Sequence, residues 1–354
     1  MSNAETNTST HEDCGVGQLV RDEDRHFSFF DIFTTWAGAN CQPTSWWIGG
    51  CIAAGGLFTV LKVNLISVPL MFIIVALVGY IGFRYPTTTM GFSRTIFGIH
   101  GSRYLALFHS ISCLGWTGVN CYLGACSLSY MFNYLLGWPA VGMPGSKWVL
   151  AVGIAICAGL TVALITIQGT RSLKVFENIG TVLIIILSIW IAYAVFKNYN
   201  MQEIIRWKPD PAYALSFGQA SDAITAFAFG WVICVIEFTR YSKTKAAATG
   251  APLLGCWFGL SLFAMVGTVG VIATTMMTGV FNEYSADPSG VAATLGLGWP
   301  AFLVILFSVV TTTVVGQYVG ACSALNAIND RIPIKKMVWI YSLICFAFAF
   351  VPLL

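Results

Sequence analysis

WAGANCQPT, at residues 36–44, interrupts the first long apolar segment of this chain. It places a glycine, two amides and a proline inside a run that otherwise has the composition of a membrane-spanning helix. Proline lacks a backbone N–H and its ring clashes with the preceding helical turn, so an α-helix does not pass unchanged through Pro43. We therefore predict that the first span unwinds here and leaves backbone carbonyls free midway through the membrane.

The composition around this stretch is that of a membrane protein. Hydrophobic residues make up 57% of the 354 positions and charged residues 9%, against roughly 25% charged residues in a soluble domain. Uncharged stretches such as 148–167 and 246–280 reach or exceed the ~20 apolar residues that cross the hydrocarbon core as a helix. We predict an all-α, multi-pass membrane protein. The net charge of +3 does not indicate a nucleic-acid partner.

Eleven cysteines are scattered mostly through the apolar stretches. They form no Cys-x-x-Cys pair and have no His–Cys spacing typical of a metal site, so we interpret them as small packing residues. The spans also lack a His-rich, paired-acid or Ser-His-Asp constellation, which argues against a membrane enzyme. No cofactor is expected.

Apolar runs between charged residues and Gly/Pro breaks predict nine spans, near residues 31–58, 64–83, 104–136, 148–167, 175–196, 219–239, 251–280, 298–328 and 337–354. Residues 1–30 are polar and lack an apolar signal segment, so they are expected to form a disordered cytosolic tail. The last span ends on residues 351–354 without a polar tail, which predicts a truncated product.

Basic residues between the predicted spans favour a cytosolic N-terminus, because Lys and Arg near span ends resist translocation. With the tail inside, eleven of them fall on the cytosolic side and five outside. The outside set is Lys62, Lys147, Lys197, Arg206 and Lys208. This distribution predicts a plasma-membrane protein with its N-terminus in the cytoplasm.

A second weak point occurs in the sixth predicted span, at Phe229-Gly230-Trp231. The first and sixth spans correspond to each other in an architecture of two inverted five-helix repeats. Paired discontinuous helices at corresponding positions are typical of secondary transporters, where freed carbonyls and half-helix ends bind solute and ion. Alternatively, the glycines and the proline only allow the helices to pack closely or to kink.

Side chains near these breaks suit a flat, uncharged heterocycle. Trp116 and Asn120 are four residues apart and therefore share one helix face, and Trp231 supplies a second indole. Aromatic pairs gain about 0.5–1.5 kcal/mol beyond the burial of their surface. Amides both donate and accept hydrogen bonds, as the edge of a nucleobase does; those in question are Asn40, Gln42, Asn120 and Gln317. Alternatively, Trp116 packs against lipid or a neighbouring helix and Asn120 only bonds across helices.

Hydroxyl groups in the eighth predicted span, Ser308 and Thr311 to Thr313, are hard oxygen donors of the kind that a small cation accepts. Sodium would fit such a set together with backbone carbonyls. The alternative is structural, because threonines in membrane helices commonly bond back to a carbonyl three or four residues earlier.

Several short motifs resemble the nucleobase-cation-symport-1 transporters, which include cytosine, purine, allantoin and hydantoin permeases. The resemblance covers most of residues 26–330. Its motifs are WAGAN at 36–40, FSRTIFG at 92–98 with Gly101-Ser102, Gly115-Trp116, and FTRY at 238–241.

The resemblance implies a leucine-transporter-like core of two inverted five-helix repeats that moves a solute and a cation by alternating access. It implies that Trp116 and Trp231 sandwich the solute ring, that Asn120 reads its edge, and that Asn40 lies at the first break. Phe229, Gly230, Thr313 and Gln317 complete the predicted solute site. Thr311 and Thr312 match the sodium-site hydroxyls, next to Ser308 and the carbonyls near Trp36 and Ala39.

The sequence departs from the family pattern in three positions and in length. The family often has an Asn after its paired Thr, another Asn four positions on, and an Asp before FTRY, where this chain has Thr313, Gln317 and Glu237. The pattern also needs a tenth span and two more, so residues 31–196 would form the first repeat and 219–354 four of the five helices of the second.

The sequence thus predicts a secondary transporter that imports a nucleobase or a related heterocycle, such as cytosine, a purine, uracil, allantoin or a hydantoin, with Na⁺ or H⁺ as the coupling ion. The alternative is a truncated, non-transporting paralogue or a solute sensor of the same fold. Its partners would be the solute, the cation and the lipid bilayer.

Overall fold

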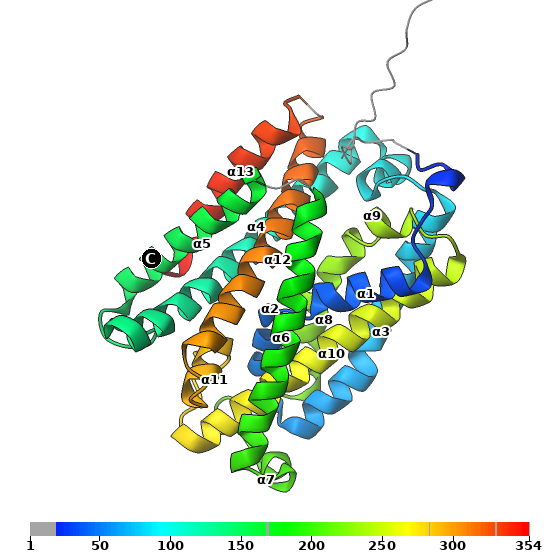
Figure 1. Ribbon diagram of the computed structural model, residues 1–354. Coiled ribbons are helices and arrows are strands. Elements are labelled where there is room, and N and C mark those ends of the chain that lie inside the picture. The colour runs from blue at the N-terminus through cyan, green and yellow to red at the C-terminus, as the bar shows by residue number, and fades with distance from the viewer. Residues whose placement is uncertain (1–18, 168–169, 283, 330, 354) are drawn as a thin grey trace, which may run out of the picture.

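A computed structural model describes residues 19–167, 170–282, 284–329 and 331–353 of the chain. Its regular elements there are helices (Figure 1), and one isolated bridge joins Phe27 to Ser242. The α-helices are α1 (Phe29–Asn40), α2 (Pro43–Cys51), α3 (Leu57–Arg84), α4 (Thr89–Leu136), α5 (Ser146–Ile167), α6 (Thr170–Asn198), α7 (Met201–Arg206), α8 (Phe217–Phe229), α9 (Ile236–Thr239), α10 (Lys245–Thr278), α11 (Pro288–Thr294), α12 (Trp299–Ala327) and α13 (Ile334–Ala349). Short 3-10 turns, η1 to η4, are Asp22–Asp24, Ile52–Gly55, Gly230–Ile233 and Val351–Leu353.

Six stretches in the described part of the chain are long and apolar enough to cross a membrane. They are Leu57–Arg84, Ser146–Ile165, Asn178–Asn198, Phe217–Thr239, Lys245–Thr278 and Trp299–Ala327. The other three predicted spans correspond to the pair α1 and α2, to the longer part of α4, and to α13. The expectation of an all-α membrane protein is thereby confirmed.

Several helices begin earlier than the sequence predicts, among them α3, α4 and α10, the last at Lys245 rather than near residue 251. Helix α3 starts at Leu57 rather than near residue 64, so Lys62 lies within the helix and not in a loop. Helix α4 starts at Thr89, where the Thr88 side chain accepts a hydrogen bond from the Gly91 N–H. Gly98, with φ +67°, bends this helix and separates a short first part from the predicted span. A glycine adopts this backbone conformation without the steric cost of a Cβ atom.

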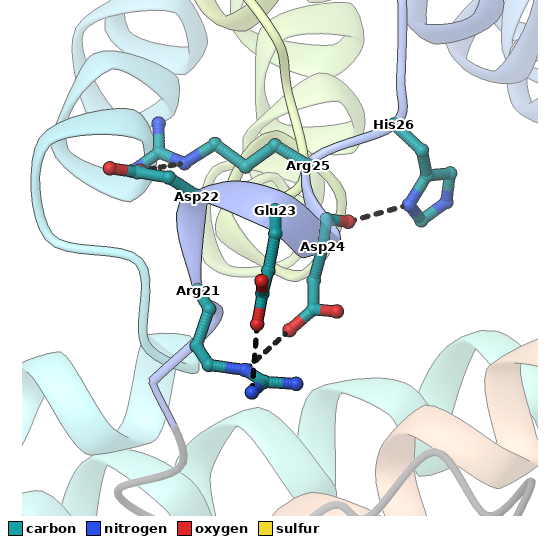
Figure 2. Close-up of polar contacts among 6 residues, drawn as sticks. All are labelled: Arg21, Asp22, Glu23, Asp24, Arg25 and His26. Atoms are coloured by element: carbon teal, nitrogen blue, oxygen red, sulfur yellow. Dashed lines mark hydrogen bonds and ion pairs between the residues drawn. The ribbon is translucent and has the colours of Figure 1, made fainter.

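Part of the predicted tail packs against the protein. Residues 1–18 lie outside the described residues, whereas Val20 N–H donates to the Pro86 carbonyl at 2.8 Å and Phe27 N–H to the Tyr241 carbonyl at 3.0 Å. Figure 2 shows the turn between them, where Arg21 and Arg25 form ion pairs with neighbouring carboxylates. Because most of these charges are exposed, we attribute the order of this segment to the backbone bonds rather than to the ion pairs.

Glycines bring both halves of the broken first helix into backbone contact with α10. A Cβ atom at Gly49 of α2 would lie 2.1 Å from the Ala264 carbonyl oxygen, and one at Gly267 of α10 would lie 2.0 Å from the Trp46 carbonyl oxygen. A Cβ atom at Gly259 would lie 2.5 Å from the Ala37 carbonyl oxygen of α1. Small residues allow this close approach of helices inside a membrane, so α10 holds the two halves in a fixed relation.

Gly267→Ala is expected to destabilise the protein by about 3 kcal/mol, because the added methyl group meets backbone atoms that do not rotate away. Thermal unfolding in detergent would measure the loss as a lower melting temperature. Gly159→Ala in α5 is the matched control, since a Cβ atom there meets nothing within 4 Å. Equal melting temperatures for both variants would contradict this packing.

The short helix α11 lies at the end of the bundle away from the N-terminal segment (Figure 1). Asp287 caps it, with its two carboxylate oxygens accepting from the Ser289 N–H at 3.2 Å and the Gly290 N–H at 3.0 Å. This carboxyl lies outside the membrane-spanning stretches and is only 6% exposed. Burial raises its pKa to about 7, and the two backbone donors oppose part of that rise.

The α11 cap should therefore weaken as the pH rises. The folded pKa of about 7 lies above the ordinary value of 3.8, so the protonated carboxyl favours the folded segment, and this stability is lost between about pH 4 and pH 7. Hydrogen exchange across residues 284–297, corrected for intrinsic rates, should accelerate at least about tenfold over that range. Asp287→Asn keeps an acceptor and should abolish the pH dependence; a variant with an unchanged profile would contradict the assignment.

Candidate functional site

The predicted interruption of the first span is present. Helix α1 ends at Asn40, and the Cys41 N–H turns back to the carbonyls of Ala37 and Gly38, each at 3.0 Å. Gln42 is extended, with φ −144° and ψ 159°, and α2 restarts at Pro43. Proline suits the first turn of a helix because its missing N–H has no partner there in any case. The first predicted span is therefore made of two helices, α1 and α2, separated by Cys41 and Gln42.

The second predicted interruption is also present. Helix α8 ends at Phe229, a 3-10 turn follows over Gly230–Ile233, and α9 spans Ile236–Thr239. Within the turn, the Cys234 and Val235 N–H groups both donate to the Trp231 carbonyl, each at 3.1 Å. The sixth span is thus broken at the position that the glycine indicated.

A side-chain hydrogen bond joins the two breaks. The Trp231 Nε1–H donates to Asn40 Oδ1 at 3.0 Å, and Asn40 Nδ2 donates to the Trp36 carbonyl at 2.9 Å. The Trp36 ring also contacts the Trp231 ring edge-on, with centroids 5.5 Å apart and planes at 82°. Residues that are 191 positions apart in the sequence therefore meet at the point where both helices lose their regular bonding.

Helix α4 contributes the second indole and an amide. A Cβ atom at Gly230 would lie 4.0 Å from Trp116 Nε1, so Trp116 faces the second break directly. Its ring packs edge-on against Phe227 at 5.0 Å. One turn further along α4, Asn120 accepts a hydrogen bond from the Thr44 hydroxyl of α2. Trp116, Asn120 and Trp231 are thereby gathered around the two interruptions.

The other predicted solute residues differ in their surroundings. Gln42 is buried and its Oε1 has no hydrogen-bond partner among the described residues. Gln317 Oε1 accepts from the Ser342 hydroxyl of α13 at 3.1 Å, and the Thr313 hydroxyl donates to the Val309 carbonyl of its own helix at 2.7 Å. Phe229 is 51% exposed. Among these side chains, Gln42 Oε1 and Gln317 Nε2 are buried polar atoms without a hydrogen-bond partner among the described residues.

The predicted cation residues lie in two helices, α1 and α12. Ser308, Thr311 and Thr312 belong to α12, and the Thr311 hydroxyl donates to the Ser308 carbonyl at 2.9 Å. In α1 the Trp36 carbonyl accepts from the Asn40 amide, as described above. A set of hydroxyl and carbonyl oxygens has the chemistry of a site for a hard cation such as sodium.

Two threonines that the sequence analysis did not assign lie at these sites. Thr44 bonds Asn120, and Thr181 of α6 lies where a Cβ atom on Gly38 would approach its hydroxyl to 3.6 Å. The adjacent Gly180 faces the Thr311 hydroxyl, at 3.2 Å from an added Cβ atom. The sequence could have pointed to Thr181, because its hydroxyl lies inside an apolar span. It could not have pointed to Thr44, because the partner of Thr44, Asn120, is 76 residues away.

Comparison with known proteins gives one family over most of the chain. Residues 19–354 match a family described as permease for cytosine/purines, uracil, thiamine, allantoin. The chain is 26% identical to a purine-cytosine permease of Emericella nidulans, over 93% of this chain and 64% of that protein. It is 24% identical to an allantoin permease of Bacillus subtilis, over 94% of this chain and 69% of that protein. The chain thus spans about two thirds of the length of these relatives.

A solved structure with the same fold is that of Mhp1, described as a nucleobase-cation-symport-1 family transporter in a closed conformation with bromovinylhydantoin bound. Its TM-score to this chain is 0.72, with 15% sequence identity, over 93% of this chain and 73% of that one. At this level of identity the likeness shows the fold of the helical bundle.

Proposed function

We propose that this chain is a transporter, because it belongs to the family of permeases for cytosine/purines, uracil, thiamine and allantoin. Membership confirms the resemblance to nucleobase-cation-symport-1 proteins and the leucine-transporter-like fold class. The family is one of permeases and not of enzymes. The chain would import a nucleobase or a related small heterocycle by alternating access, driven by a coupling cation.

The observation that carries this proposal is the meeting of two broken helices at a pair of indoles. Trp231 belongs to the turn that breaks the sixth span, and Trp116 faces the same turn across Gly230. A flat solute between two such rings gains stacking energy that does not depend on charge. Backbone groups that lack regular helical bonds at such breaks would add donors and acceptors for the solute.

The polar groups around the indoles would select the solute by hydrogen bonding. The unpaired Gln42 Oε1 requires a donor, which an N–H of a heterocycle supplies. Asn120 would read a second position on the ring edge, next to Thr44. Phe229, Gly230, Thr313 and Gln317 complete the proposed site. A solute that lacks the N–H would leave a buried acceptor unpaired, which is a strong basis for rejection.

The coupling cation would bind beside the first break. We assign sodium to the Ser308, Thr311 and Thr312 hydroxyls together with carbonyls near Trp36 and Ala39, because these are oxygen ligands without a titratable group. Proton coupling is the competing assignment. A cation at this position would hold α1 against α12 and so favour one of the two alternating states.

The arrangement in the membrane follows from the distribution of basic residues. We place the N-terminus in the cytoplasm of a plasma-membrane protein, residues 31–196 in the first repeat and residues 219–354 in the second. The segment at residues 19–28, which packs against the loops after α3 and α9, would then lie on the cytoplasmic side.

Trp116→Ala and Trp231→Ala should each weaken solute binding by roughly 1–3 kcal/mol, as removal of base-stacking aromatic residues does. Binding of cytosine, adenine, uracil and allantoin to the purified chain, followed by thermal shift or calorimetry, would measure this. Trp339→Ala on α13 is the control, because that indole is 47% exposed on the outer surface. Unchanged affinity in both site variants would contradict the proposed stacking of the solute between Trp116 and Trp231. Binding of a solute without its accumulation in proteoliposomes would indicate a sensor.

Thr312→Ala should abolish the sodium dependence of solute binding if the hydroxyl coordinates the ion. Titration of the same bases with and without sodium, at constant ionic strength, would test this. Thr161→Ala is a matched control, since the Thr161 hydroxyl is buried in α5 and bonds the Cys157 carbonyl of its own helix. Retained sodium dependence in Thr312→Ala would exclude this hydroxyl as a ligand.

A further inference from the structure

Asn40 lies where the sequence predicts a residue that reads the solute, but both ends of its amide are already bonded within the protein. We propose that Asn40 is a positioning residue that fixes the Trp231 indole and acts on the solute through that ring. This inference rests on the proposed function, because it concerns the stacking wall of the same site.

The chemistry of the partners determines the orientation of the amide. An indole N–H only donates, so the atom 3.0 Å from Trp231 Nε1 must be the Asn40 oxygen. A backbone carbonyl only accepts, so the atom 2.9 Å from the Trp36 oxygen must be the Asn40 nitrogen. The two bonds agree on one orientation, and a flipped amide would break both of them.

Burial makes this arrangement rigid. Asn40 is 0% exposed, and its Cβ atom lies 2.9 Å from the position of a Cβ atom on Gly259 of α10. A buried polar group that loses its partner keeps the full cost of desolvation. Rotation of the Trp231 ring away from Asn40 would leave the buried Asn40 oxygen without this partner, and that loss opposes the rotation.

The hydrogen bond between Asn40 and Trp231, called the clamp below, has a consequence for solute recognition. Since the only donor of the Trp231 indole is bonded to Asn40, the ring has no N–H to offer the solute and contributes its flat face. The Trp36 ring packs edge-on against it and limits tilting. Selection among heterocycles would then depend on groups such as Gln42 and Asn120, while Trp231 accepts any flat ring of suitable size.

Helix α3 offers a matched control in Asn64. It is also buried, and its Nδ2 donates to the carbonyl four residues earlier, Val60, at the same 2.9 Å. Its Oδ1, however, has no hydrogen-bond partner among the described residues. The Trp257 Nε1–H of α10 donates to the Asn64 backbone carbonyl at 2.8 Å, a group that Asn64→Leu retains. Asn40 and Asn64 therefore share the bond within the helix and differ in whether the side-chain oxygen accepts from an indole.

A double-mutant cycle tests the proposal. Dissociation constants for cytosine, adenine, uracil and allantoin are measured for the chain, for Asn40→Leu, for Trp231→Phe, for the double variant and for Asn64→Leu. Phenylalanine keeps a flat ring but has no N–H. Asn40→Leu should weaken binding about tenfold in the otherwise unchanged chain and less than about twofold in the Trp231→Phe background. Asn64→Leu should leave affinity unchanged.

An equal loss of affinity in both backgrounds would overturn the proposal, because Asn40 would then contact the solute independently of the indole. Failure of the proposed function has a different signature: the unchanged chain would bind none of the four compounds. In that case melting temperatures without solute decide the matter. A drop caused by Asn40→Leu that disappears in the Trp231→Phe background supports the clamp, and an equal drop in both backgrounds refutes it.

Discussion

Backbone groups in hydrocarbon need hydrogen-bond partners, and this constraint determines how the two broken helices of this protein can be arranged. An unbroken helix meets the requirement within itself, whereas a break exposes N–H and carbonyl groups at a cost of several kcal/mol each. This chain breaks two spans and brings the breaks together. The Asn40 amide donates to the Trp36 backbone carbonyl, and its oxygen accepts from Trp231 of the other broken span. The glycines of α10 hold both halves of the first span against it. Close packing and side-chain bonding thus make the interruptions tolerable.

The same arrangement accounts for the character of the site. The proposed site would have indole walls, and its polar groups would be amides and hydroxyls, which suits an uncharged ring with alternating donors and acceptors. Because the Trp231 N–H is bonded to Asn40, the Trp231 ring would only stack on the solute, and other groups would select the solute by hydrogen bonding. Gln42 retains an unpaired oxygen, and Asn120 is held by Thr44. A family of permeases for several different heterocycles is consistent with a general stacking wall and a variable set of selecting amides.

The breaks could be predicted from the sequence because Pro43 and Gly230 act on the backbone locally. The apolar spans could be predicted because hydrocarbon imposes a length. The start of α3 at Leu57 could not be predicted, because the charged residue Lys62 was expected in a loop and instead lies exposed within that helix. Pairings between distant residues could not be predicted either, because no local sequence pattern links Thr44 to Asn120 or Asn40 to Trp231. The positions of the two breaks were therefore predictable, whereas the bond between Asn40 and Trp231 required coordinates.

The most direct measurement is a cryo-electron microscopy map of the protein with a bound heterocycle from the family's substrate range. The account predicts planar density between the Trp116 and Trp231 rings, an N–H of the ligand at Gln42 Oε1, and the Asn40 amide still bonded to the Trp231 indole. Continuous helix through residues 36–44 and 229–233, with the ligand bound elsewhere and both indoles facing lipid, would contradict it.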